Sequence, residues 1–360
     1  ETSGAIENKD AVSAGSSVTI EAGTKIKNAA VTANAGSVSM TATKASIENS
    51  GAVEAKGESS SVSMTAKNTD NGSISNADIV KAGKDVTETA GTTLTNTGAV
   101  TASKGAIDQD AGGKLWNKVA VQAGSTIDMT STGADIQNDA NVTAGTGITM
   151  GASTAIDNSN SNLTVSSTSG DISLTAGTSI INDIVNTGGS ISMDTATSGT
   201  GSIENTGAVT AGGALTEKAE TTLKNTGAVK AATGITMEAG TSISNGSTVE
   251  ATGGSIGMTA TNAGITNTGA VTATGASSSV SMSATNGSAG AISNSEAVSA
   301  GTSVTMTAGT SISNAAVTGN AGSVSMTATN AGITNNGDVK AIGDSSSISM
   351  TATNNVSGAI

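Results

Sequence analysis

Three kinds of short apolar segment recur in a fixed order along the chain. Their typical members are residues 38–42 (Val-Ser-Met-Thr-Ala), 47–49 (Ile-Glu-Asn) and 53–55 (Val-Glu-Ala). Apolar and polar residues alternate within each segment, which is the period of a β-strand that buries one face. Gly, Ser, Thr and Asn connect the segments, and these residues tolerate sharp turns. The pattern therefore predicts an all-β fold with three short strands in each repeat.

The repeat is about 19 to 24 residues long and occurs about 16 times. Its first segment opens at residues 18, 38, 62, 86, 107, 127, 148, 172, 191, 215, 235, 256, 280, 304, 324 and 348. Repeats of this size, each in contact only with its neighbours, form solenoids. We therefore expect a parallel β-helix (β-solenoid) of about 16 coils, running through residues 1–360 as a single continuous segment.

A longer period is superimposed on the coils. Residues 1–74 align without a gap on residues 287–360, so residues 1–286 form one super-repeat and residues 287–360 start the next. A solenoid normally ends in an atypical polar coil, and neither end of this sequence reads as one. We therefore expect more of the same chain, or further copies of it, to stack at both ends.

Two columns of residues mark the expected interior. All 11 Met follow the opening of the first segment by two residues, as core filler would: Met40, Met64, Met129, Met150, Met193, Met237, Met258, Met282, Met306, Met326 and Met350. The second segment ends in Asn in every coil, and stacked amides can donate to one neighbouring coil and accept from the other. This predicts a structural ladder of Asn8, Asn28, Asn49, Asn76, Asn96, Asn117, Asn138, Asn158, Asn182, Asn205, Asn225, Asn245, Asn267, Asn294, Asn314 and Asn335.

Three coils carry anomalous polar residues at the interior Met position: Glu88, Gln109 and Glu217. The next segment of the same coils begins with Leu instead of Ile: Leu94, Leu115 and Leu223. One interpretation is a local pocket or ligand site. The interpretation we favour is that the strand ends early, the acid reaches solvent at a corner and Leu refills the volume, because a buried unpaired carboxylate is costly. Lys84 and Lys218 are nearby candidates for ion-pair partners.

Trp116 is the single aromatic residue of the chain, in the middle of a second segment where alternation points it outward. An exposed aromatic side chain could be a surface contact, either a platform for a glycan or a lateral protein contact. It could equally lie flat on the aliphatic stems of its neighbours. The sequence leaves these interpretations open.

Composition and charge exclude several function classes. The chain has no Cys, His, Pro, Phe or Tyr, and its net charge is −13. Nucleic acids and anionic membranes require a basic surface, so we expect neither as a partner. No apolar run approaches the length of a bilayer-crossing helix, so we expect no membrane-spanning segment.

A polysaccharide lyase or hydrolase is the enzymatic alternative, because β-helices host such enzymes. These enzymes need a positioned base or paired carboxylates in a cleft with aromatic sugar platforms. The chain has no His, no Arg and one aromatic residue, and its acidic residues mostly alternate outward, as at Glu48, Glu54 and Glu204. No nucleophile elbow, phosphate-binding loop or metal-spaced His/Cys set occurs. We therefore predict no enzyme activity, no catalytic, cofactor-binding or metal-binding residues, and no cofactor.

Ice binding is a third class, since ice-binding solenoids use flat faces that bear Thr. Outward Thr is common in this chain. However, the same outward position holds Thr266, Glu204, Lys224 and Asp157 in different coils, whereas a face that matches a lattice should be more uniform.

Runs such as GSVSMTATNAGITN (322–335) resemble the haemagglutinin-type repeats of filamentous-haemagglutinin-like adhesins. The resemblance covers the whole chain and lies in the style of the repeat. It implies a right-handed parallel β-helix and a large exoprotein of a Gram-negative bacterium, exported by two-partner or autotransporter (type V) secretion. The Asn column also resembles the asparagine ladder of pectate-lyase-type β-helices.

We therefore expect the structural shaft of a secreted bacterial surface adhesin or filament, which holds a distal binding element away from the cell. The expected location is extracellular, at the bacterial cell surface. The alternative is a self-assembling extracellular matrix fibre, formed by end-to-end or lateral packing. A host-cell or glycan receptor is a further partner class that this segment does not locate.

Overall fold

The computed structural model describes residues 4–195 and 199–353, and these residues are all-β. The 48 strands lie in three parallel sheets, stacked as a β-solenoid of about 16 turns with three strands per coil. The predicted fold class and the three strands per coil are confirmed. Within the described ranges, no helix is long and apolar enough to cross a membrane.

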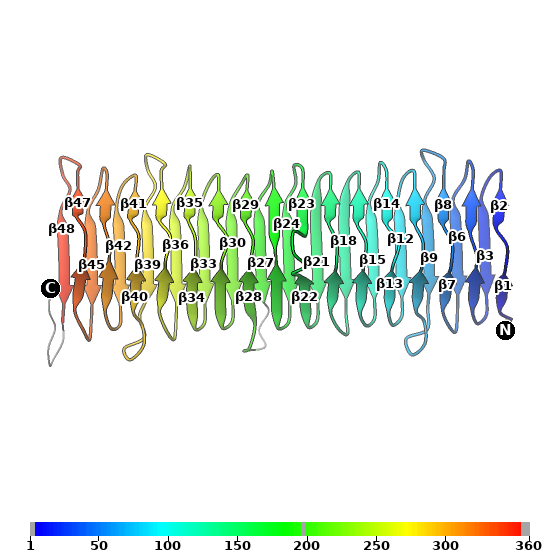
Figure 1. Cartoon of the computed structure of the whole chain (residues 1–360), viewed down its shortest axis with the longest axis horizontal. Coiled ribbons are helices and arrows are strands. Elements are labelled where there is room, and N and C mark those ends of the chain that lie inside the picture. Colours follow the sequence, from blue (N-terminus) through cyan, green and yellow to red (C-terminus); the bar gives the residue numbers. More distant parts are fainter. Residues whose placement is uncertain (1–3, 196–198, 354–360) are drawn as a thin grey trace. The chain divides into compact units, whose positions relative to one another are not determined.

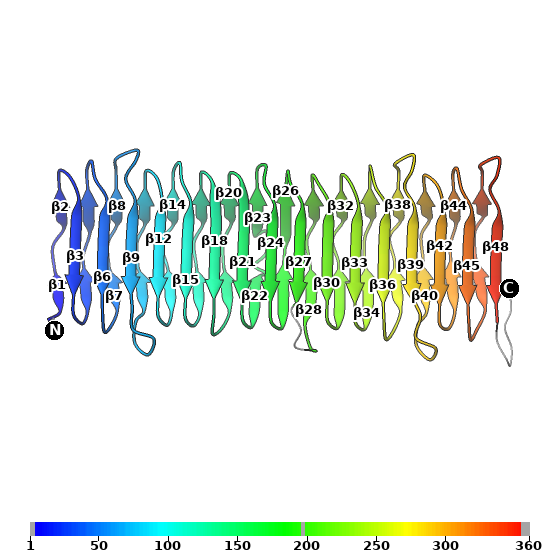
Figure 2. The same ribbon diagram turned by 180° about the vertical axis from the view of Figure 1, so that it is seen from behind.

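The chain divides into two compact units. Unit 1 comprises residues 1–177 and 181–183, and unit 2 comprises residues 178–180 and 184–360. Strand β25 (Ser179–Asn182) contributes residues to both units. Within each unit, Figures 1 and 2 show the strands of successive coils side by side, with turns at both strand ends.

In unit 1 the second segment of each coil forms sheet A: β1 (Ile6–Asn8), β4 (Ile26–Asn28), β7 (Ile47–Asn49), β10 (Ile74–Asn76), β13 (Leu94–Asn96), β16 (Leu115–Asn117), β19 (Ile136–Asn138) and β22 (Ala155–Asn158). The third segment forms sheet B: β2 (Val12–Ala14), β5 (Val31–Ala33), β8 (Val53–Ala55), β11 (Val80–Ala82), β14 (Val100–Ala102), β17 (Val121–Ala123), β20 (Val142–Ala144) and β23 (Thr164–Ser167). The first segment forms sheet C: β3 (Val18–Ala22), β6 (Val38–Ala42), β9 (Val62–Ala66), β12 (Val86–Ala90), β15 (Ile107–Ala111), β18 (Thr126–Ser131), β21 (Gly147–Ala152) and β24 (Ile172–Ala176).

Unit 2 has the same three layers. Its sheet A contains β28 (Ser202–Asn205), β31 (Thr222–Asn225), β34 (Ser242–Asn245), β37 (Ile265–Asn267), β40 (Ile292–Asn294), β43 (Ile312–Asn314) and β46 (Ile333–Asn335). Its sheet B contains β26 (Ile184–Thr187), β29 (Val209–Ala211), β32 (Val229–Ala231), β35 (Val249–Ala251), β38 (Val271–Ala273), β41 (Val298–Ala300), β44 (Val317–Gly319) and β47 (Val339–Ala341). Its sheet C contains β27 (Ile191–Thr195), β30 (Leu215–Ala219), β33 (Ile235–Ala239), β36 (Ile256–Ala260), β39 (Val280–Ala284), β42 (Val304–Ala308), β45 (Val324–Ala328) and β48 (Ile348–Ala352).

Neighbouring coils pair in register, so that like residues stack. Strands β36 and β39 are an example: Ile256 lies beside Val280, and Met258 lies beside Met282. Buried and more exposed residues alternate along both strands. Because a slip of one residue would turn every apolar side chain outward, the alternation holds this register. The interior is accordingly built from stacked Val, Ile, Leu, Met and Ala side chains.

Glycine allows close contact between the backbones of successive coils at the corners. Gly145 lies between sheets B and C, and a Cβ atom at this position would collide with the backbone oxygen of Gly124 in the preceding coil. The missing side chain lets the two turns approach. This explains why two coils in succession place Gly at the same corner.

Candidate functional site

The Asn side chains of sheet A form a chain of amide hydrogen bonds in each unit. Each Nδ2 donates to the Oδ1 of the Asn in the next coil, over 2.7–3.1 Å. In unit 1 the ladder runs from Asn8 to Asn182, and in unit 2 it runs from Asn205 to Asn335. Apart from Asn8 and Asn335, which are half-buried, every ladder side chain is buried. The structure thus places the predicted positions inside and bonds each one to its equivalents.

The ladder amides also face the Met column of sheet C. The Nδ2 of Asn28 lies 3.2 Å from the Sδ of Met40, and that of Asn314 lies 3.3 Å from the Sδ of Met326. Ten of the eleven Met side chains are buried, and Met350 in β48 is half-buried. A thioether sulfur is a weak acceptor. In most coils, therefore, the second N–H of the ladder amide has only a weak partner.

Glu88 and Gln109 replace two successive Met and give the ladder strong partners. The Oε1 of Glu88 accepts from the Nδ2 of Asn76 at 2.7 Å, and its Oε2 accepts from the Nδ2 of Asn96 at 2.9 Å. Gln109 donates from Nε2 to the Oε2 of Glu88 at 2.7 Å and accepts at Oε1 from Asn117 at 2.9 Å. Burial raises the pKa of the Glu88 carboxyl, and the three donated hydrogen bonds oppose that rise.

Glu217 occupies the same position in unit 2 and holds two ladder amides. Its Oε1 accepts from the Nδ2 of Asn205 and its Oε2 from the Nδ2 of Asn225, both at 2.8 Å. Its neighbours in register on sheet C are Met193 and Met237. Burial raises the pKa of the Glu217 carboxyl to about 7, although the hydrogen bonds from Asn225 and Asn205 lower it. This interior carboxyl therefore titrates near neutral pH.

Our preferred explanation of these polar residues is wrong. Strands β12, β15 and β30 continue for two residues beyond them, so the strands do not end early. Glu88, Gln109 and Glu217 are all 0% exposed. Lys84 pairs with Asp85 at 3.0 Å, and Lys218 is exposed on the outer face. The physical reason is that the Asn ladder supplies the amide donors that a buried carboxyl requires. The sequence does contain a signal for this arrangement: each Glu has a ladder Asn 12 residues before it and another 8 residues after it.

Trp116 lies on the outer face of β16, where its neighbours hold the ring. Its Nε1 donates to the Oδ2 of Asp139 at 2.7 Å. The Nζ atoms of Lys118 and Lys114 lie 3.9 and 4.8 Å from the ring centroid. Gln137 accepts from Lys114 and donates to Asp139, which closes the cluster. The ring is therefore half-buried under two ammonium groups.

Replacing Asp139 with Ala should release the Trp116 indole N–H to water. We expect the fluorescence of this single Trp to shift to longer wavelength, and stability to fall by about 1–2 kcal/mol because a charge-assisted hydrogen bond is lost. Asp157→Ala is the control, since it removes a carboxylate from sheet A two coils away from Trp116. An emission spectrum that Asp139→Ala leaves unchanged would contradict the hydrogen bond.

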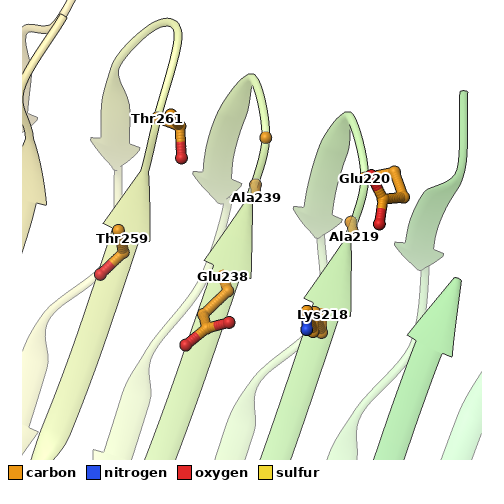
Figure 3. A pocket seen from close by; sticks show the side chains of 8 residues that line it. Lys218, Ala219, Glu220, Glu238, Ala239, Thr259 and Thr261 are labelled. Carbon is orange, nitrogen blue, oxygen red and sulfur yellow. The ribbon is translucent and has the colours of Figure 1, made fainter. Parts of the chain in front are cut away.

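A shallow depression of about 330 Å³ lies at the carboxyl ends of β30, β33 and β36. Lys218, Glu238 and Thr259 line it from the strands, and Glu220 and Thr261 from the turns beyond (Figure 3). These residues present one ammonium group, two carboxylates and two hydroxyls on successive coils. A depression at the same place in three coils of unit 1 has a similar lining. Its recurrence indicates that the depression follows from the shape of the coil.

Across residues 4–195 and 199–353, no group of three or more His, Cys, Asp or Glu is placed to hold a metal ion. A comparison of the chain with protein-family models, curated proteins and solved structures found no match. The functional proposal therefore rests on the geometry of the chain and on the style of its repeats.

Proposed function

We propose that this chain is the structural shaft of a secreted bacterial surface adhesin or filament, and that it acts mechanically rather than as an enzyme. The observation that supports the proposal most is the way each coil is joined to the next within a unit. In unit 2, for example, β31 pairs with β34, β32 with β35 and β33 with β36. A ladder hydrogen bond from Asn225 to Asn245 adds an interior link between the same coils.

This construction suits a shaft for two physical reasons. Within each unit, successive coils are joined by three strand pairings and one amide link, so separating two coils requires many hydrogen bonds to break together. The strands of each coil pair only with strands of the neighbouring coils, so the length of such a structure grows by adding coils without changing the fold. The resemblance of the repeats to those of secreted adhesins motivates the proposed location at the bacterial cell surface.

Electron microscopy of native material, combined with antibody labelling of intact cells, would test the shaft. We expect label on filaments at the surface of unpermeabilised cells, and a denatured chain mass well above the 34.1 kDa of this segment. Label found only after the cells are permeabilised would overturn the surface location. Filaments that dissociate under denaturing conditions into chains of about this mass would favour the matrix fibre instead.

A further inference from the structure

The tripeptide Asn-Gly-Ser occurs three times in the chain, at residues 71–73, 245–247 and 286–288. An Asn followed by Gly is prone to lose its side-chain amide, because the backbone nitrogen of the next residue can attack it and Gly has no side chain to hinder the approach. The three tripeptides are identical, so their intrinsic reactivity is nearly the same. A large difference between them in the folded chain therefore has to come from the structure.

Asn286, in the corner between β39 and β40, has an arrangement that favours this attack. Its side-chain oxygen Oδ1 accepts three hydrogen bonds: from the backbone N and the Oγ of Ser288, both at 2.9 Å, and from the backbone N of Ala289 at 3.1 Å. The N–H of Gly287, which is the attacking group, donates no hydrogen bond within the described ranges. The nucleophile is thus free, and the group that it attacks is held.

The three donors around Oδ1 stabilise the charge that the attack produces. When the nitrogen of Gly287 bonds to the Cγ of Asn286, negative charge develops on Oδ1. Donors at 2.7–3.1 Å from such an oxygen form an oxyanion hole, and those around Asn286 lie at 2.9–3.1 Å. The Asn286 side chain is half-buried and the adjacent Gly287 is exposed, so water has access to the corner.

Asn71 has the same tripeptide but lacks both features. The N–H of Gly72 donates to the backbone oxygen of Asn68 at 2.7 Å, so this hydrogen bond would have to break before the nitrogen could attack. The Oδ1 of Asn71 accepts no hydrogen bond from the part of the chain that the structure describes. Asn71 is exposed, so access to water does not distinguish it from Asn286.

Asn245 is a member of the ladder and is protected more completely. Its side chain is buried, its Oδ1 accepts from Asn225 at 3.1 Å, and its Nδ2 donates to Asn267 at 2.7 Å. The N–H of Gly246 donates to the backbone oxygen of Asn225 at 2.7 Å. The attacking group and the amide are therefore both held in hydrogen bonds away from water.

We propose that Asn286 is a self-modification site, at which the folded chain converts its own asparagine into aspartate and isoaspartate with water as the only co-reactant. Hydroxide takes the proton from the nitrogen of Gly287, this nitrogen bonds to Cγ, and the Cγ–Nδ2 bond breaks. Ammonia leaves with a proton from water, and a cyclic succinimide remains. Water then opens the ring: cleavage of the bond from the nitrogen to Cγ gives aspartate, and cleavage of the bond to the backbone carbonyl carbon gives isoaspartate. No oxidant or reductant is needed.

The modification changes the surface of unit 2 while leaving its strands in place. Between Glu250 and Asp338 the chain has one charged residue, Glu296, and the product adds a second negative charge there. Isoaspartate also lengthens the main chain by one carbon in a corner that Asn330 holds through the backbone oxygen of Gly287 at 2.7 Å. The corner lies outside β39 and β40, so their pairing is kept. The inference goes beyond the shaft and does not depend on it.

Incubation of the folded full chain at neutral pH, followed by mass spectrometry of its peptides, tests the proposal. Cleavage after Glu places the three tripeptides in separate peptides: residues 59–88, 239–250 and 251–296. We expect Asn286 to react about tenfold faster than Asn71, because its nucleophile is free and its oxygen is held, and we expect no product at Asn245. In denaturant the three rates should converge. Equal rates at Asn71 and Asn286 in the folded chain, or a rate at Asn286 below that of the unfolded chain, would overturn the proposal.

The role of the oxygen donors is tested separately with Ser288→Ala, which removes the Oγ donor and keeps both backbone donors. We expect the ratio of the folded to the unfolded rate at Asn286 to fall by about tenfold. Ser73→Ala is the matched control, since it makes the same change in a tripeptide whose Asn71 oxygen accepts no described hydrogen bond. This control should leave the ratio at Asn71 unchanged. A ratio at Asn286 that Ser288→Ala does not lower would refute the oxyanion hole.

Asn336 supplies a further comparison within the native chain, because it is also exposed and followed by Gly. Within the described residues the N–H of Gly337 is free, as that of Gly287 is, but no donor contacts the Oδ1 of Asn336. We therefore expect the ratio of the folded to the unfolded rate to be higher at Asn286 than at Asn336. The reverse order would show that a free Gly N–H alone sets the rate, and would overturn the assignment of Asn286 as a built site.

Discussion

Replacing Asn225 with Leu is expected to lower the free energy for opening the surrounding coils by about 3–5 kcal/mol. The Nδ2 of Asn225 donates to Asn245 at 3.1 Å and to the Glu217 carboxyl at 2.8 Å, and its Oδ1 accepts from Asn205 at 2.8 Å. Leucine has a similar volume and no polar atom. The change therefore leaves three buried polar groups without one of their partners. Amide hydrogen exchange, measured separately for each coil, would give the decrease in the free energy of opening.

Asn245→Leu is the matched control for this prediction. Asn245 accepts from Asn225 and donates to Asn267 at 2.7 Å, but its other neighbour is the Sδ of Met258 at 3.8 Å. A thioether loses little when an amide donor is removed. We therefore expect Asn225→Leu to cost about 1–3 kcal/mol more than Asn245→Leu. Equal losses for the two variants would mean that the Glu217 carboxyl does not depend on the ladder.

The coil that contains Glu217 is expected to lose stability as the pH rises through neutrality. Burial raises the pKa of this carboxyl from 4.5 to about 7 in the folded chain. Between these pH values the folded state keeps a proton that the unfolded state has released, so opening becomes easier as pH increases. The stabilising contribution is complete below about pH 4.5 and is lost above about pH 7. Since each pH unit is worth about 1.4 kcal/mol, the total loss is about 3 kcal/mol.

Glu217→Met and Glu217→Gln isolate this titration, and the chain itself provides both precedents. Met occupies the equivalent position in eleven coils, and Gln109 shows that an amide fits there. Neither residue ionises, so both variants should lack the loss of stability between pH 5 and pH 8. Comparing each variant with the native chain at the same pH removes the intrinsic pH dependence of hydrogen exchange. If all three proteins followed parallel curves, the interior carboxyl would not be responsible.

Glu88 is held by three amide donors, whereas two contact Glu217. For a shaft, these two coils would be the places where the packing of the interior depends on pH, because the other described coils place Met, Leu, Ile or Gln at the same position. The buried Glu residues, which look anomalous in the sequence, thus make the stability of the surrounding Asn ladder depend on pH.

Most of the architecture could be predicted from the sequence, for a physical reason. A strand shows its buried face through alternation of period two, and a solenoid repeats that alternation in every coil. The strand that begins at Val38 and the Asn at position 205 could therefore be placed without coordinates. Their burial and register in the structure follow from the same alternation. Likewise, Trp116 could be assigned to the outer face from its neighbours Leu115 and Asn117 alone.

The partners of the polar residues could not be predicted in this way. The alternation of apolar and polar residues indicates which face of the strand a side chain occupies, but it does not indicate which side chains of another sheet lie opposite. The contacts of Glu217 with Asn205 and Asn225 cross from sheet C to sheet A, and the path of the chain around each corner decides them. The same holds for Trp116 and Asp139, which come together from successive coils. The sequence by itself determined the strands, the repeat and the inward columns, because these depend on local periodicity. Only the tertiary structure decided that a buried acid could stay in the core, because its stability depends on donors brought close by the closure of the coil.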